Sequence, residues 1–191
     1  MKKSTITILA VIAVVVILIV SVMGSYNGLV DKQTNIESKQ AQIQTQLQRR
    51  ADLIPNFVAT VKDYTKYEQS TLQAVTDARA AVKAATTPEQ QAQASQQLDT
   101  AIDVWVNAVT EAYPDLKANT QYIALQDELA GTENRIATAR KDYNEAVQTY
   151  NSSIRKFPTS LLAGLFGFEK AEFFAADDDA QDVPDVGELL G

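Results

Sequence analysis

The sequence predicts an all-α protein in which an N-terminal transmembrane helix precedes an up-and-down antiparallel four-helix bundle. Three observations support this prediction. The chain begins with a long aliphatic stretch, its later apolar residues recur at helical spacing, and it has only seven Gly and five Pro among 191 residues. Apolar side chains at alternating three- and four-residue steps form one stripe along a helix, and short connections between such helices favour antiparallel neighbours.

The N-terminal stretch is long enough to cross a lipid bilayer. Residues 4–25 contain no charged residue, and residues 6–23 are almost entirely aliphatic. A hydrocarbon core about 30 Å thick is spanned by about 20 apolar residues in a helix. We therefore interpret residues 1–25 as a membrane anchor that contacts lipid. Its anchoring residues are Ile6, Leu9, Val14, Ile17, Leu18 and Val22.

A cleaved secretory signal is the alternative interpretation of this stretch. Lys2 and Lys3 provide the basic start of such a signal, and residues 22–24 form a tolerable cleavage context. The apolar part of a signal usually runs about 7–15 residues, which is shorter than the stretch seen here. The uncleaved anchor is therefore favoured. Lys2 and Lys3, weighed against Lys32 and Lys39 on the other side, favour a cytoplasmic N-terminus and an external domain.

Composition excludes several classes of function. The chain has no Cys and no His, which removes disulfides, thiolate or His-based zinc sites and His-containing triads. We predict no enzyme, no catalytic residue, no cofactor and no metal site. Six of the 24 acidic residues lie in residues 175–191, leaving 18 acids against 17 bases elsewhere. That balance offers no basic face for nucleic acid, and we expect the acidic tail to be disordered.

Residues 26–157 are predicted to form the bundle, and its first helix carries a seven-residue repeat. One row of this repeat contains Leu29, Ile36, Ile43, Arg50, Phe57 and Tyr64. Pro55 interrupts the run, because a proline inside a helix removes a backbone donor and clashes with the preceding turn. Either a long helix kinks there, or the chain breaks and a second helix runs from about residue 56 to residue 85. The break is favoured, since proline suits a first helical turn.

Later helix ends are marked by capping residues. Thr87, with Pro88 and Gln90 behind it, has the pattern of a capping box at the start of a third helix. The Tyr-Pro-Asp sequence at residues 113–115 ends that helix. Asn119 is placed to cap a fourth helix, which we expect to stop before Phe157 and Pro158.

Residues 158–174 are apolar and glycine-punctuated but too short to span a bilayer. Four antiparallel helices would return the chain to its starting side, next to Tyr26 and the membrane. In one interpretation this segment dips into the membrane interface, with Lys170 near the headgroups. In the other it folds back over the open end of the bundle. The candidate interface residues are Leu161, Leu162, Leu165, Phe166, Phe168, Phe173 and Phe174.

Two polar clusters are candidates for interaction. The first contains Arg49, Arg50 and Asp52, which would bind an anionic headgroup or a partner's carboxylate; alternatively, Arg50 packs its stem and pairs its charge within the fold. The second is a Tyr-Asn pair that is repeated after seven residues. This spacing places the two tyrosines on one face of a helix and the two asparagines on the adjacent face. The repeated pair would form a peptide-binding groove, or else the tyrosines are core residues. This second cluster comprises Tyr143, Asn144, Tyr150 and Asn151.

Several motifs follow one another in a recognisable order. They include YNGLV at residues 26–30, QLQRRADLIPN at 46–56, EAYPDLKA at 111–118 and TENRIA at 132–137. Phe-Pro at residues 157–158, Gly-Phe at 167–168 and Phe-Phe at 173–174 complete the pattern. Together these motifs resemble the LemA family of bacterial membrane proteins. The resemblance implies a short N-terminus, one transmembrane helix and an up-and-down bundle of four helices. It implies no chemical activity; relatives are linked to membrane remodelling or to membrane-protein quality control.

The predicted function is that of a non-enzymatic scaffold or membrane-associated oligomer in a bacterial cell membrane. Its expected partners are membrane lipid, a second copy of the chain and another membrane protein. The glutamine-rich part of the repeat, residues 31–46, would support self-association in the manner of a coiled coil. The alternative is an adaptor or sensor whose bundle binds a partner membrane protein or a protease in envelope quality control.

Overall fold

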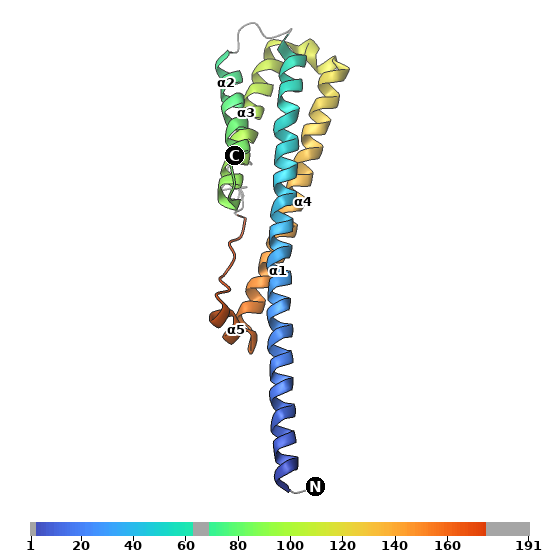
Figure 1. Cartoon of the computed structure of the whole chain (residues 1–191). Coiled ribbons are helices and arrows are strands. Elements are labelled where there is room, and N and C mark those ends of the chain that lie inside the picture. The colour runs from blue at the N-terminus through green and yellow to red at the C-terminus, as the bar shows by residue number, and fades with distance from the viewer. Residues whose placement is uncertain (1–2, 63–68, 175–191) are drawn as a thin grey trace, which may run out of the picture.

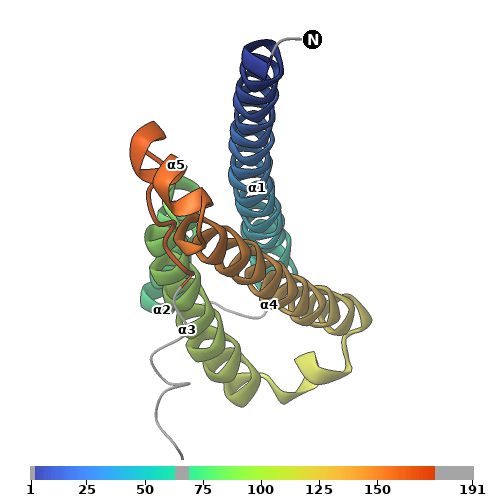
Figure 2. The ribbon, with the colours of Figure 1, turned by 90° about the horizontal axis from the view of Figure 1, so that it is seen from below.

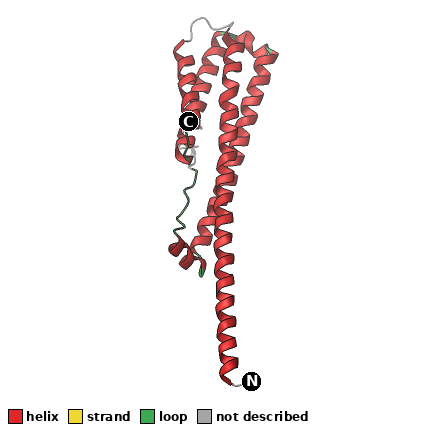
Figure 3. Cartoon of the chain, viewed as in Figure 1, coloured by secondary structure: helices red, strands yellow, loops and turns green. Residues whose placement is uncertain are grey.

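A computed structural model describes residues 3–62 and 69–174 of the chain, and all regular structure in these ranges is helical (Figures 1 and 3). The elements are α1 (Lys3–Lys62), α2 (Gln69–Ala84), α3 (Pro88–Ala112), the 3-10 helix η1 (Pro114–Ala118), α4 (Thr120–Arg155) and α5 (Thr159–Phe166). The predicted all-α class is confirmed. The acidic tail predicted for residues 175–191 lies outside the described residues.

The four long helices run alternately up and down, as predicted (Figure 1). The first part of α1 extends well beyond the bundle, and the end of α4 and α5 lie beside the middle of α1. Contacts between helices are most extensive in two pairs, α1 with α4 and α2 with α3. Seen from below, the α2–α3 pair lies beside the α1–α4 pair (Figure 2). The bundle is therefore two antiparallel helix pairs placed side by side.

The seven-residue repeat of α1 is used inside the chain's own fold. Leu29, Ile36, Ile43 and Phe57 of the first row are all buried, as is Arg50. The Phe57 ring lies 5.3 Å from that of Trp105 in α3 and 5.4 Å from that of Tyr122 in α4. Such aromatic contacts add to the stabilisation that burial of apolar area provides. The stripe thus packs against α3 and α4 rather than facing a second copy.

Two helix starts match the capping residues in the sequence. The Thr87 hydroxyl accepts a hydrogen bond from the backbone N–H of Gln90, and Oε1 of Gln90 accepts one from the backbone N–H of Thr87, which completes the predicted capping box. The Asn119 side chain accepts from the backbone N–H groups of Gln121 and Tyr122 at the start of α4. Both caps satisfy donors that lack partners within the helix.

The predicted break at Pro55 is wrong, because α1 continues through it to Lys62. Pro55 cannot donate a hydrogen bond to the carbonyl four residues earlier, which belongs to Ala51. Nε of Arg79, in α2, donates to that carbonyl oxygen at 2.8 Å instead. A side chain from a neighbouring helix therefore replaces the missing partner. The second helix begins at Gln69, not near residue 56.

The predicted anchor forms the first part of α1, and this part stands clear of the bundle (Figure 1). Within the described residues, α1 is the one helix that is long and apolar enough to cross a membrane. None of the described part of its apolar stretch is buried in the protein, so these aliphatic side chains face the surroundings. The exposed anchoring residues are Leu9, Val14, Ile17, Leu18 and Val22. The side chain of Ile6 lies outside those described.

Candidate membrane-proximal site

Three segments meet α1 just after its apolar stretch: the end of α4, α5, and residues 167–174. We call residues 167–174 the strap. The Tyr26 ring lies 5.0 Å from the ring of Phe166 and 5.5 Å from that of Phe168, both in edge-on contacts. The expectation that the fourth helix returns the chain to the vicinity of Tyr26 is confirmed. These contacts place α5 and the strap at the level where the apolar helix joins the bundle.

The ends of α5 are set by its local sequence. Proline cannot extend a preceding helix, and Pro158 follows the end of α4 directly before α5 begins. Gly167 adopts a left-handed conformation with φ of 73° and ends α5, while the N–H of Phe168 donates to the carbonyl of Ala163 at 2.9 Å. Glycine is the usual residue at this position because it has no Cβ to clash. The chain therefore reverses tightly into the strap.

One side of α5 packs on the protein and the other is exposed and apolar. Ala163 is buried, and Leu162 is half-buried. By contrast, Leu161 is 66% exposed, Leu165 76% and Phe166 48%. Phe157, just before α5, is 81% exposed. A contiguous group of large exposed apolar side chains is typical of a surface that meets lipid or another protein.

The strap is held on α4 by asparagine side chains that bind its backbone. Asn151 donates to the carbonyl of Ala171 at 2.8 Å and accepts from the N–H of Ala171 at 2.9 Å. Asn144 binds Phe174 in the same two-way manner, at 3.1 and 2.8 Å. Seven helical residues rise about 10.5 Å, and three extended residues span about 10 Å. The two spacings match, so one helix face captures an extended chain.

Aromatic contacts complete this arrangement. The Tyr143 hydroxyl donates to the carbonyl of Glu172 at 3.0 Å, and the guanidinium carbon of Arg140 lies 4.9 Å from the centre of the Phe174 ring. Phe174 is only 3% exposed, so its assignment to a membrane interface is wrong. It packs into the protein because the strap turns its ring toward Tyr143 and Arg140. Phe168 is half-buried, and Phe173 remains 48% exposed.

The interpretation in which residues 158–174 fold back over the bundle describes the strap. The exposed apolar side chains of α5 and Phe157 leave insertion into the membrane interface as a prediction. The Tyr-Asn pairs hold a peptide, and this peptide is the chain's own strap. Burial raises the pKa of Tyr143, with a further contribution from the nearby Glu172 carboxylate. Burial likewise raises the pKa of Tyr150, assisted by Glu169. Both hydroxyls are therefore neutral hydrogen-bonding groups at pH 7.

The Arg49, Arg50 and Asp52 cluster lies elsewhere, along the body of the bundle, where Arg50 is buried and the other two side chains are exposed. It is 24 residues beyond Tyr26, or about 36 Å along α1. Each of its three charged side chains forms an ion pair within the protein. Arg50 pairs with Asp99 and Glu133, Arg49 with Glu128 at 2.7 Å, and Asp52 with Lys83 at 3.0 Å. The interpretation of Arg50 as a packed and paired residue matches this geometry, and its distance from the anchor does not suit headgroup binding.

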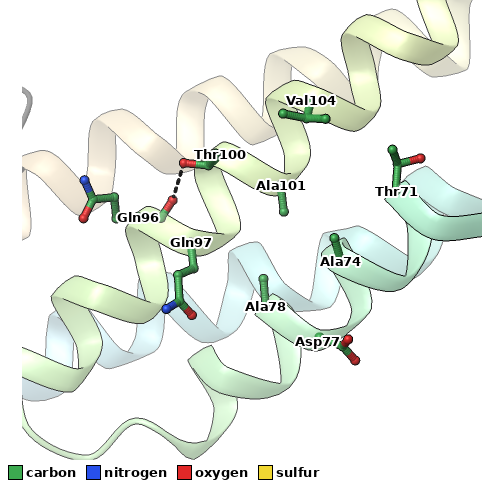
Figure 4. Close-up of a pocket in the computed structure, with 9 residues that line it drawn as sticks. All are labelled: Thr71, Ala74, Asp77, Ala78, Gln96, Gln97, Thr100, Ala101 and Val104. Atoms are coloured by element: carbon green, nitrogen blue, oxygen red, sulfur yellow. Dashed lines mark hydrogen bonds between the residues drawn. The ribbon is translucent and has the colours of Figure 1, made fainter.

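Another hollow lies between α2 and α3, with a volume of about 750 Å³. Thr71 and Val104 lie at one end and Gln96 and Gln97 at the other, with small alanine side chains along the floor (Figure 4). Val104 is 54% exposed. Among the described residues, no group of His, Cys, Asp or Glu is arranged to hold a metal ion.

Comparison with known proteins decides the family. The model of the LemA family matches residues 39–187, which is most of the chain.

The chain belongs to the LemA family.

The similar proteins include two kinds of relative. Protein LemA of Metamycoplasma hominis is 26% identical over 171 residues, covering 87% of this chain and 76% of that protein. Magnetosome protein MamQ 2 of Paramagnetospirillum magneticum is 43% identical over 77 residues, covering 40% of this chain and 28% of MamQ 2. Magnetosome protein MamQ of Magnetospirillum gryphiswaldense is 36% identical over 67 residues, 35% of this chain and 25% of that protein. The match thus spans about a quarter of the length of the MamQ proteins.

One feature of the site in this LemA-family chain was not predicted from its sequence. Arg155 and Lys156, at the end of α4, lie beside Lys170 of the strap around a common hollow. Two adjacent bases without an acid nearby, directly before Phe157 and Pro158, were a visible signal in the sequence. Their proximity to Lys170 was not visible, because it depends on how the strap folds.

Proposed function

We propose that this protein is a non-enzymatic, single-pass scaffold of the bacterial cell membrane that contacts lipid through α5 as well as through its anchor. The observation that carries the proposal is the exposed apolar surface of α5, which lies beside Tyr26 where the anchor joins the bundle. Two apolar elements at one end of a rod would hold the bundle at the bilayer surface. The bundle would then present its sides to other membrane components or to further copies of the chain.

The absence of an enzymatic role is part of this proposal. The sequence has no His or Cys, and several carboxylates of the described bundle form ion pairs, such as Lys39–Asp142 at 3.0 Å. General acid–base chemistry needs titratable groups gathered around a substrate site with a nucleophile or an anion-stabilising group. The described side chains provide structural pairs between helices instead.

Spin labelling of the full chain tests the lipid contact directly. Because the native chain has no Cys, Leu165→Cys and Val104→Cys each give one labelling site. Both positions are exposed, but Val104 lies on α3 in the body of the bundle. In phosphatidylcholine vesicles, a nitroxide at residue 165 should be more accessible to oxygen than to a water-soluble nickel complex. The control at residue 104 should show the reverse. Equal accessibility to the nickel complex at both sites would overturn the proposal.

Orientation and self-association have tests of their own. We expect the N-terminus in the cytoplasm, so an impermeant maleimide should label the Val104→Cys variant in intact cells; protection until lysis would reverse this orientation. We also expect the full chain to form defined oligomers in light scattering after size-exclusion chromatography. A strictly monomeric protein would remove self-association from the proposal.

The hollow between α2 and α3 supports a second candidate function, an adaptor that binds a partner membrane protein or a protease. Its floor of small side chains would admit a helix of the partner closely, and Val104 would provide an apolar contact. A photo-crosslinker at Thr100, which lines this hollow, should then capture one discrete partner in native membranes. The same probe at Thr149, an exposed position on α4, is the matched control. Equal capture from both positions would count against an adaptor site here.

A further inference from the structure

A second hollow, of about 400 Å³, lies between the end of α4 and the strap. Three cationic side chains line it, Arg155 and Lys156 from the end of α4 and Lys170 from the strap. Phe173 closes one side. The strap is fixed here because Asn151, which also lines the hollow, binds both backbone groups of Ala171, the residue after Lys170. The position of Lys170 is therefore set by the fold.

Among the described residues, no carboxylate oxygen lies within 4.0 Å of Arg155, Lys156 or Lys170. Glu169 and Glu172 belong to the same strap as Lys170 but form no ion pair with these three bases. Elsewhere, bases of the bundle meet acids, as in Arg49–Glu128 at 2.7 Å and Lys83–Asp52 at 3.0 Å. The chain as a whole carries a net charge of −7. A group of cations that lack ion-pair partners among the described residues attracts an anion locally.

Helix electrostatics account for only part of this group. Cations at the end of a helix interact favourably with its carbonyl groups, which would suffice for Arg155 and Lys156. Lys170 does not belong to that helix; the asparagine-held strap brings it to the same hollow. Bases from two segments thus converge on one space, which is the arrangement that a phosphate group requires.

The surroundings of the hollow identify the source of the anion. Phe173, in its wall, is 48% exposed, and the exposed apolar residues of α5 follow the end of α4. A free anion would gain nothing from these side chains, whereas a lipid has acyl chains beside its phosphate. We infer that this hollow binds the phosphate of an anionic phospholipid headgroup. The inference rests on the proposed function, in which this end of the bundle faces the bilayer.

The expected effect follows from the attraction of a basic residue to an anionic membrane surface. Each such residue contributes about a fivefold change in affinity near that surface. Removing two charges should therefore weaken the preference for an anionic lipid by about 30-fold at low salt, and by less at higher ionic strength. Because Lys156 and Lys170 are exposed, their replacement by glutamine should leave the fold intact.

The experiment uses the full chain in phosphatidylcholine vesicles, with a donor dye on Thr159→Cys at the start of α5. Trace phosphatidylglycerol or phosphatidylcholine, each labelled on an acyl chain, acts as the acceptor. Energy transfer should show enrichment of phosphatidylglycerol, and Lys156→Gln with Lys170→Gln should abolish most of it. The matched control, Lys117→Gln with Lys141→Gln, removes the same charge from η1 and from the body of α4. Trp105 fluorescence checks the fold of both variants.

Each result has a defined meaning. Equal enrichment in the two double variants would overturn the headgroup site. If millimolar inorganic phosphate displaced phosphatidylglycerol, phosphate alone would suffice for binding. The hollow would then be a free-anion site, and the lipid assignment would be overturned. The proposed function is tested separately, by the depth of the nitroxide at residue 165 in vesicles without anionic lipid. A label exposed to water there would reject the proposed function. A label at lipid depth together with no phosphatidylglycerol preference would reject this inference alone.

Discussion

Replacing Arg79 with methionine tests how α1 remains continuous through a proline. Nε of Arg79 donates to the carbonyl of Ala51 at 2.8 Å, in the position that the N–H of residue 55 would occupy in any other helix. Ala51 is fully buried with Arg79 in place, and a methionine side chain at residue 79 would cover the carbonyl without offering a donor. Arg79→Met keeps most of the side-chain stem and removes the donor. We expect a loss of stability that depends on the presence of Pro55.

The magnitude follows from the contacts of the guanidinium. A hydrogen bond to a charged group contributes about 1.5–3 kcal/mol, and an unsatisfied buried carbonyl costs a similar amount. The second contact of Arg79, with Asp52 at 3.8 Å, is solvent-exposed and largely screened, so it contributes little. Arg79→Met should therefore lower the free energy of unfolding by about 2–3 kcal/mol. In a Pro55→Ala background the new N–H binds the carbonyl, and the same change should cost less than about 1 kcal/mol.

A double-mutant cycle measures this coupling. Denaturant unfolding of the full chain in detergent micelles can be followed through Trp105, which is the single tryptophan and is only 2% exposed. The matched control is Arg135→Met, because Arg135 pairs with Glu128 at 3.3 Å on an exposed surface. Its cost should be the same in both backgrounds to within about 0.5 kcal/mol.

Two outcomes would refute this account of α1. If Arg79→Met costs the same with proline or alanine at residue 55, the guanidinium does not replace the missing backbone donor. If Pro55→Ala lowers the free energy of unfolding, Pro55 must stabilise the protein in another way, and its missing backbone donor would not be its main effect. A coupling energy of about 1–2 kcal/mol, with the control uncoupled, would support the replacement of a backbone partner by a neighbouring helix.

Two further predictions concern the strap and its tyrosine. Asn151→Ala removes both hydrogen bonds to Ala171, so we expect the free energy of unfolding to fall by about 2 kcal/mol and deuterium exchange at residues 171–174 to become faster. The control Ser152→Ala, at an exposed position, should change neither quantity. Unchanged exchange in Asn151→Ala would contradict the assigned contact. The pKa of Tyr143 is raised by burial and by Glu172, so the unfolded chain loses this proton first. Its contribution to stability should be complete below pH 10.0 and decline above it, and Tyr143→Phe should reduce that decline in unfolding curves; an identical decline would argue against the shift.

The features determined by the sequence alone are those whose physical cause is local or periodic. The candidate membrane-spanning part of α1 depends only on the length and polarity of one stretch. The caps at Thr87 and Asn119 act on backbone groups two or three residues away. The stripe containing Leu29, Ile36 and Ile43 follows from the helical period, and it correctly identifies buried positions. Each of these can be predicted without knowing which helix lies opposite.

Tertiary structure decided the features whose partners lie far along the chain. Pro55 remains helical because its donor comes from Arg79, 28 residues after the carbonyl it serves. Phe174 is buried, and Lys170 joins Arg155, because asparagines 20 and 30 residues earlier bind the strap. Exposure of apolar residues in α5 likewise depends on which of its sides packs against the bundle. Spacing in a sequence records the period of a helix, but it does not specify which distant group will complete a hydrogen bond.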